Sequence, residues 1–175
     1  YGRYLRQVLY TLFIEHKLSL PLWDMHIGYG SDILTTLHYY VIGDPLTLLA
    51  VFVPESKTEA LYAFLIFLRI YLAGIAFSRY SFYHKNSKQA AFMGTMIYIF
   101  AGWTIYAAMK HPYFSNPMIY LPLILLGIDK IYKKEKPHLF ICATAVAAMS
   151  NFYFFYMISI FMVLYAAFRY FGIFR

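Results

Sequence analysis

The sequence predicts an all-α membrane protein whose helices cross the bilayer several times. Of its 175 residues, 62% are hydrophobic and only 13% are charged, which is about half the charged share of soluble domains. The apolar residues also form long uninterrupted blocks instead of alternating patterns, which favours spanning helices over strands. This composition excludes a soluble fold and an intrinsically disordered chain.

Residues 1–57 are expected to lie at the extracytoplasmic membrane surface without crossing it. The apolar residues of the first stretch recur with helical spacing: Leu5, Val8, Leu9, Leu12 and Phe13. This spacing predicts an amphipathic helix in the interface. A proline and two glycines then favour an ordered loop over 20–32, with Ser31 or Asp32 as the N-cap of a short helix. Asp44-Pro45 predicts the start of a re-entrant or interfacial helix that is too short to cross.

Five membrane-spanning helices are predicted in residues 58–175. The block from Ala60 to Ser78 contains Arg69 as its only charge, and the block from Ala90 to Met109 contains none. Each is close to the ~20 residues that cross a hydrocarbon core. A third block, with aromatic residues at both ends, is a plausible crossing. The expected limits are about 58–80, 90–109, 114–132, 138–151 and 153–172.

The last two of these helices come from one apolar run, Leu139 to Phe168, which holds thirty residues without a charge. At about 1.5 Å per residue this run is too long for one upright span and short for two. A hairpin that turns near Ser150-Asn151 would return Arg169 to the same side as the other basic loops. We favour this hairpin, and a single tilted helix is the alternative.

The positions of Lys and Arg predict the orientation in the cell membrane. Seven of them follow the first and third spans: Arg79, Lys85, Lys88, Lys130, Lys133, Lys134 and Lys136. Lys110 stands alone between those spans, so the two basic loops are expected to be cytoplasmic and 110–116 extracytoplasmic. The net charge of +7 is thereby explained without a nucleic-acid partner. Asp129 and Lys133, at i and i+4, are expected to form a structural pair.

Three residues of the 20–32 loop could carry chemistry. Asp24 and Asp32 are candidate catalytic groups, and with His26 they could act as a general base or hold a divalent cation. Trp23, an aromatic anchor beside them, is a candidate for substrate binding. The structural alternative is that Asp24 forms a turn and Asp32 caps a helix.

Arg69 is the most informative single residue of the predicted spans. It lies about ten residues from each end of its span, too far for its side chain to snorkel to the interface, so it should face protein or water. A guanidinium there could bind the phosphate of a lipid-linked substrate. A structural pair with a carboxylate is the alternative.

Two outer turns contain further candidates. His111 stands in a loop that two prolines hold in shape, where it could be catalytic or a fixed interfacial histidine, and Ser115 or Asn116 could cap the next helix. Asn151 and Tyr153 begin a run of aromatic residues at the predicted hairpin tip. These two are candidates for binding a sugar, and an interfacial aromatic belt is the ordinary alternative.

Several blocks of the sequence, in this order, resemble the YfhO family of bacterial multi-spanning membrane proteins. They are Leu-Pro-Leu-Trp-Asp (20–24), Gly28-Tyr-Gly30-Ser-Asp32, Asp44-Pro45, Leu72-Ala-Gly74, His111-Pro112-Tyr-Phe114, Asn116-Pro117-Met118, Leu121-Pro122-Leu123 with Gly127, and Asn151-Phe-Tyr-Phe-Phe-Tyr-Met157. The resemblance covers essentially the whole chain. Because the family's chains are several times longer, we expect this sequence to be an N-proximal fragment.

The resemblance implies an integral-membrane glycosyltransferase-like protein of the C-type fold. Such a protein would transfer a sugar from a polyprenyl-phosphate-linked donor to an extracytoplasmic cell-envelope acceptor, for example teichoic acid, in contact with membrane lipids. The family's key acidic residue would precede Tyr1, and Asp32 and Arg69 match positions at which the family tends to have polar or charged residues. A transporter or lipid flippase without bond-breaking chemistry is the alternative, and a structural scaffold is a third.

Overall fold

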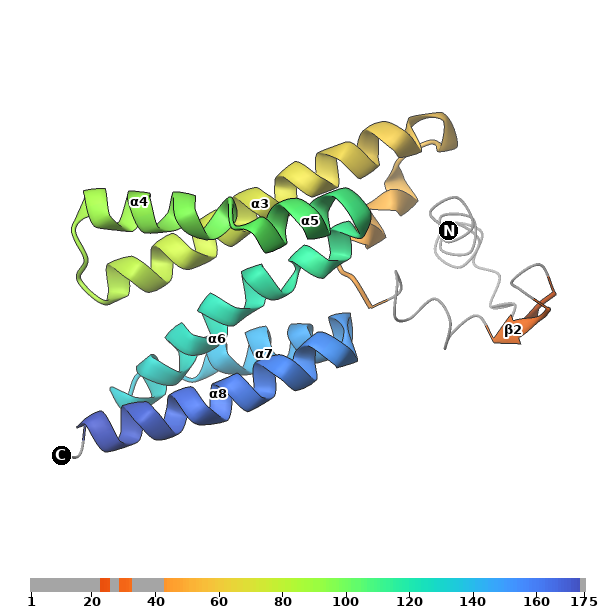
Figure 1. Ribbon diagram of the computed structural model, residues 1–175. Helices are drawn as coiled ribbons and strands as arrows, with labels where there is room; N and C mark the ends of the chain where they lie inside the picture. Colours follow the sequence, from red (N-terminus) through yellow and green to blue (C-terminus); the bar gives the residue numbers. More distant parts are fainter. Residues whose placement is uncertain (1–22, 26–28, 33–42, 174–175) are drawn as a thin grey trace. The chain divides into compact units, whose positions relative to one another are not determined.

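The computed structural model describes residues 23–25, 29–32 and 43–173 (Figure 1). The predicted amphipathic helix, His26 and residues 33–42 lie outside this part of the chain. The chain divides into two compact units, Tyr1–Leu65 and Ile66–Arg175. Each is described by itself.

The first unit contains a short β-hairpin. Strand β1 (Trp23–Asp24) pairs antiparallel with β2 (Ser31–Asp32), so that Trp23 lies opposite Asp32 and Asp24 opposite Ser31. The turn depends on Gly30, whose φ is +100° and whose added Cβ would lie 3.0 Å from Nε1 of Trp23. Ser31 and Asp32 themselves belong to a strand pair, and the short helix that either residue was predicted to cap lies outside the described residues.

The segment after Asp44 is helical, but its helix is tighter and shorter than predicted. The buried Asp44 carboxylate accepts hydrogen bonds from the Leu46 amide at 3.1 Å and the Thr47 hydroxyl at 2.6 Å. Asp44 thus closes a turn in front of a 3-10 helix, η2 (Thr47–Phe52), and a second short one, η3 (Glu55–Lys57), follows. Pro45 precedes η2 and is not its first residue.

Within the described residues, two helices are long and apolar enough to cross a membrane. Helix α3 (Thr58–Tyr83) begins in the first unit and continues through the second. Helix α8 (Phe152–Ile173) ends the described chain, and its spanning part is Phe152–Gly172. Their length and composition support a membrane location.

The predicted span 90–109 is divided into two helices. Helix α4 (Lys88–Ile99) begins at Ser87, whose hydroxyl accepts a hydrogen bond from the Ala90 amide, and α5 (Gly102–Lys110) follows after Phe100 and Ala101. A 3-10 turn, η4 (Pro112–Ser115), then leads into α6 (Pro117–Tyr132).

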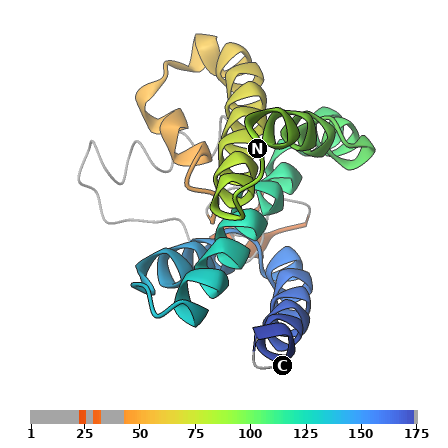
Figure 2. The ribbon, with the colours of Figure 1, turned by 90° about the vertical axis from the view of Figure 1, so that its left-hand side faces the viewer.

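Helix α6 is central to the second unit. Most of its residues are buried, and Ile124 is fully buried. It packs against both α7 (His138–Ser150) and α8, with Gly127 in close contact with Phe140 of α7. Figure 2 shows α6 between α3 on one side and α7 and α8 on the other.

The apolar run from Leu139 to Phe168 consists of two helices, as the hairpin interpretation requires. Helix α7 ends at Ser150, Asn151 is extended, and α8 begins at Phe152. The side-chain oxygen of Asn151 accepts a hydrogen bond from the Phe154 amide at 3.2 Å, which caps the first turn of α8.

Candidate functional site

Arg69 is buried within the second unit, with only 3% of its surface exposed. It lies near the middle of the apolar helix α3. As expected from its position, its side chain is enclosed by protein instead of reaching an interface. A buried guanidinium needs hydrogen-bond acceptors, because removing a cation from water is costly.

Asn116, which is 1% exposed, provides a hydrogen-bond acceptor for the guanidinium of Arg69. Its Oδ1 accepts a hydrogen bond from Nε of Arg69 at 2.9 Å, and its Nδ2 donates to the hydroxyl of Ser150 at 3.3 Å. These contacts join α3 to the beginning of α6 and the end of α7. We call Arg69, Asn116 and Ser150 the Arg69 cluster.

Asn116 does not act as the helix cap that the sequence suggests. It stands at the N-cap position of α6, but its side chain makes no capping hydrogen bond. Its amide faces Arg69 and Ser150 instead, so a tertiary contact has displaced the local one. Within the described part of the chain, the hydroxyl of its buried neighbour Ser115 has no hydrogen-bond partner.

The chemistry of the Arg69 cluster suits an anion. The amide oxygen of Asn116 fixes the orientation of the guanidinium, and an arginine side chain keeps its positive charge in a protein. The planar guanidinium matches the oxygens of phosphate and carboxylate. The cluster therefore presents a fixed cation, with hydroxyl groups nearby in the chain, inside a largely apolar helix bundle.

An aromatic group lies at the same end of α6 as Asn116. The ring of Phe154 contacts Phe114 of η4, with centroids 5.0 Å apart, and Trp103 of α5 at 6.1 Å. Tyr153, a predicted substrate-binding residue, is about half exposed, and its ring lies 5.3 Å from that of Phe154. Asn151 is buried as the cap of α8.

His111 is an exposed residue of the α5–η4 turn in this same region. Its Nδ1 lies 3.1 Å from the Tyr113 hydroxyl, and its ring packs 5.1 Å from that of Phe114. The buried Pro112 fixes the turn. The structure thus places His111 and Tyr153 around connected aromatic rings at one end of the second unit.

The other predicted site residues belong to the β-hairpin of the first unit. The pairing of β1 and β2 brings Asp24, Asp32 and Trp23 together, and Trp23 is largely exposed. Among the described residues, no group of three or more His, Cys, Asp or Glu residues is arranged to hold a metal ion.

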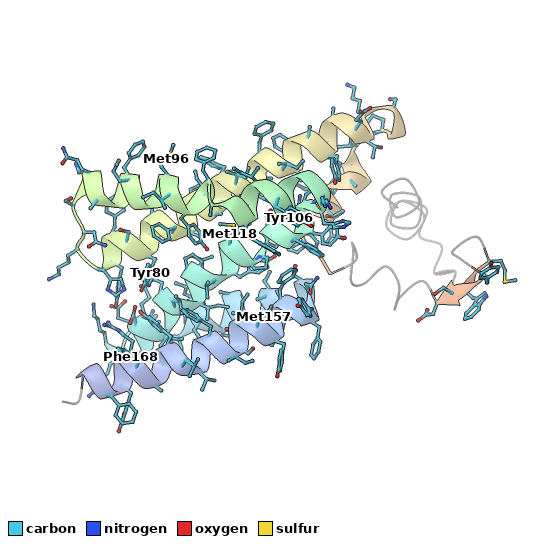
Figure 3. The ribbon with its side chains drawn as sticks, viewed as in Figure 1. Tyr80, Met96, Tyr106, Met118, Met157 and Phe168 are labelled. Atoms are coloured by element: carbon cyan, nitrogen blue, oxygen red, sulfur yellow. The ribbon has the colours of Figure 1, made fainter. Side chains whose placement is uncertain are left out.

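A second polar centre, which sequence reasoning missed, lies around Asp129 of α6. The side chain of Asp129 is fully buried and accepts hydrogen bonds from Arg169 Nε at 2.7 Å and the Tyr165 hydroxyl at 2.8 Å. Nε2 of His84 lies 2.9 Å from Oδ2 of Asp129, the same oxygen that accepts from Tyr165, whereas Arg169 bonds to Oδ1. Tyr80, labelled in Figure 3, extends the group through its hydroxyl, 3.1 Å from that of Tyr165.

We call Asp129, His84, Tyr165 and Arg169 the Asp129 network. The predicted pair of Asp129 with Lys133 is wrong, because Asp129 points into the packing between helices. Lys133 instead lies over the ring of Tyr83, with its Nζ 4.1 Å from the ring centroid. The sequence signal that could have found the network is Tyr165 and Arg169, spaced i and i+4 in an otherwise apolar helix.

The described chain is largely α-helical, and two of its helices are long and apolar enough to cross a membrane. The family model described as bacterial membrane protein YfhO matches residues 4–175, so the chain belongs to the YfhO family. The YfhO protein of Bacillus subtilis (strain 168) is 30% identical over 174 aligned residues, which cover 90% of this chain and 20% of that relative. The chain thus spans about a fifth of that relative's length. No solved structure matches.

Proposed function

We propose that the full-length protein is an integral-membrane glycosyltransferase that uses a polyprenyl-phosphate-linked sugar. The acceptor would be an extracytoplasmic polymer of the cell envelope, such as teichoic acid. The observation that supports this proposal most is the buried Arg69, whose guanidinium is held in place by a hydrogen bond to the side chain of Asn116. A fixed cation among apolar helices is suited to the phosphate of a lipid-linked donor.

The proposed reaction is a substitution at the anomeric carbon of the donor sugar. The acceptor hydroxyl oxygen bonds to this carbon while the bond between the carbon and the phosphate oxygen breaks. The phosphate leaves with the bonding electron pair, and the hydroxyl proton passes to a general base. Arg69 would stabilise the negative charge that develops on the departing phosphate.

The position of the Arg69 cluster within the second unit fits this role. Asn116 immediately precedes α6 and Ser150 ends α7, so the cluster lies toward the end that carries the 110–116 loop and the Asn151 turn. The charge distribution predicts this end to be extracytoplasmic. A polyprenyl phosphate keeps its chain in the hydrocarbon and its phosphate toward that side, so Arg69 could meet the phosphate from within the bundle.

Other residues are candidates for the remaining roles in the proposed reaction. The exposed rings of Trp103 and Tyr153 could stack on a sugar. Asp24, Asp32 and His111 remain the candidate groups for accepting the hydroxyl proton. In the described chain, the Ser115 hydroxyl is a buried donor without a partner, and it could contribute to the phosphate site.

A transporter or flippase is the second candidate, and the interruption between α4 and α5 favours it. Substrate sites of transporters are commonly formed by discontinuous helices. Against it, the residues of α6 between Asn116 and Asp129 are almost all apolar, and most of them are buried. These residues of α6 therefore do not line a polar path for a transported substrate.

The test compares Arg69→Ala and Arg69→Lys with Arg79→Ala in the full-length protein. Arg79 lies on the same helix but is exposed, so it is a matched control for the loss of one arginine. Membrane vesicles containing each variant are supplied with a radiolabelled polyprenyl-phosphate-linked sugar, and label in the envelope polymer is measured. Loss of one donor to a developing charge typically lowers the rate about 10²–10³-fold.

The expected result is a loss of this size for Arg69→Ala, a partial loss for Arg69→Lys, and full activity for Arg79→Ala. Each variant must reach the membrane in equal amount. Unchanged polymer labelling in Arg69→Ala would remove Arg69 from the site. Movement of intact donor across the membrane, without release of polyprenyl phosphate, would favour the transporter.

A further inference from the structure

The turns after α3 and α6 lie side by side at one end of the second unit. The Tyr83 hydroxyl donates to Glu135 at 2.8 Å, and the ammonium groups of Lys133 and Lys130 lie 4.1 and 5.6 Å from the Tyr83 ring centroid. Seven basic residues surround these turns: Arg79, Lys85, Lys88, Lys130, Lys133, Lys134 and Lys136. We call them the basic end. All are exposed except Lys130, which is partly exposed.

Few carboxylates offset this charge. Glu135 is the exposed one between the turns, and it binds Lys130 at 2.9 Å. Asp129 is buried and is engaged by His84 and Arg169. Among the described residues, Lys133 contacts the Tyr83 ring but no carboxylate. The basic end therefore carries a large excess of positive charge on an accessible surface.

Both turns use the same helix-ending motif. After α3, the Lys85 amide donates to the Phe82 carbonyl at 2.9 Å and the next amide to the Ser81 carbonyl at 3.4 Å. After α6, the Lys134 amide donates to the Ile131 carbonyl at 2.9 Å and the next amide to the Lys130 carbonyl at 2.9 Å. These pairs of bonds form the Schellman motif, whose left-handed position is usually glycine.

Lysine occupies the left-handed position in both motifs. The φ angles are +60° for Lys85 and +59° for Lys134, and within the described chain they are the two positive φ values outside glycine. A side chain with a Cβ is disfavoured there. A signal for membrane orientation needs positive charge only somewhere in the loop. Orientation therefore does not explain why lysine stands at the two least favourable positions of these turns.

We propose that the basic end is a binding surface for the headgroups of anionic phospholipids, with Lys85 and Lys134 as principal contacts. Both lysines follow directly on largely apolar helices, one of which is long enough to cross a membrane, and this position is the depth of lipid headgroups. Their charge is complementary to the headgroup phosphates, and each lysine near an anionic surface contributes measurably to attraction. The proposal does not depend on the transfer reaction.

The test uses two double variants of the full-length protein in neutral detergent. Lys85→Gly with Lys134→Gly removes the charge and relieves the backbone, whereas Lys85→Asn with Lys134→Asn removes the charge with a residue that tolerates this conformation. Lys110→Asn, at the end of α5, is the control for loss of an exposed lysine. Apparent affinity for phosphatidylglycerol and for phosphatidylcholine is obtained from the lipid-dependent rise in melting temperature.

Both double variants should lose affinity for phosphatidylglycerol, about five-fold per lysine and about 25-fold together. Affinity for phosphatidylcholine should be unchanged, and without lipid the glycine variant should melt at the same or a higher temperature. Lys110→Asn should bind both lipids as the parent does. Unchanged phosphatidylglycerol affinity in the double variants would overturn the proposal. An equal loss of affinity for phosphatidylglycerol and phosphatidylcholine in the double variants would also overturn it. The same holds if the double variants keep their lipid affinity but insert into the cell membrane in the inverted orientation.

Discussion

Asp129 is expected to be the polar side chain whose loss most destabilises the second unit. Its carboxylate is fully buried, and its contacts reach the turn after α3 through His84 and α8 through Tyr165 and Arg169. Replacing Asp129 by alanine removes the shared acceptor of three side chains at once. It also leaves the guanidinium of Arg169 facing the space where its carboxylate lay.

The magnitude follows from the burial of the partners. Breaking a buried ion pair by removing one member costs about 3–5 kcal/mol. The side chain of Arg169 is 34% exposed, so water can solvate it partly, and Asp129→Ala should cost about 3 kcal/mol, near the lower limit. Asp129→Asn keeps one acceptor oxygen but loses the charge, and a hydrogen bond to a charged group contributes about 1.5–3 kcal/mol. We expect about 2 kcal/mol for this variant.

The assay is unfolding of the full-length protein in mild detergent, followed through its tryptophan fluorescence as a denaturing detergent is added. The control is Glu135→Gln, which removes an exposed carboxylate that also bonds a lysine and a tyrosine. This control should leave the unfolding midpoint nearly unchanged, because exposed pairs contribute little. A midpoint for Asp129→Ala equal to that of Glu135→Gln would refute the reasoning.

Three shorter predictions concern packing, pH and orientation. Gly127→Ala should destabilise by about 1–3 kcal/mol, since its methyl group would lie 2.8 Å from the α7 backbone, whereas Gly102→Ala, with open space around it, should be neutral or stabilising. Hydrogen bonds from a lysine and a tyrosine lower the pKa of Glu135 in the folded protein. These bonds therefore stabilise the fold at pH values above the pKa of Glu135 in the unfolded chain, and this stabilisation is lost as the pH falls through its pKa in the folded protein. The small melting difference expected at neutral pH between the parent and Glu135→Gln should therefore disappear in acid, and a small difference that stays constant with pH would contradict this. Single cysteines made by Lys88→Cys and His111→Cys, without the native cysteine, should react with an impermeant maleimide in intact cells only at the second position; the reverse pattern would invert the orientation.

The helices could be predicted from the sequence because long apolar blocks leave few alternatives. The turn at Asn151 was predictable for the same reason, since a run of thirty residues fits neither one span nor two without a break. The division between α4 and α5 was missed, because Phe100 and Ala101 carry no polar or helix-breaking signal of their own. The β-hairpin was missed because strands of two residues are too short to show alternation.

The candidate site was predictable only as far as single residues. The burial of Arg69 follows from its distance to either end of its helix, but its acceptor Asn116 lies 47 residues away. Local sequence preference predicted that Asn116 caps a helix, but in the folded chain its side chain bonds to Arg69 instead. Asp129 shows the same competition: a lysine at i+4 was available, yet the carboxylate bonds to side chains 36 to 45 residues distant.

The two polar centres of the second unit lie at opposite ends of α6, which relates the proposed reaction to depth in the bilayer. Asn116 and Asp129 are separated by thirteen positions, or roughly 20 Å along a helix, against about 30 Å for the hydrocarbon core. If the Asp129 network lies at the cytoplasmic interface, as the charge distribution predicts, the Arg69 cluster would lie about 10 Å inside the outer boundary of an upright α6. At that depth a guanidinium cannot rely on water, which is the physical reason for the buried amide of Asn116. It is also a depth that a phosphate on a polyprenyl chain can reach from within the membrane, whereas a water-soluble sugar nucleotide would have to leave its solvent.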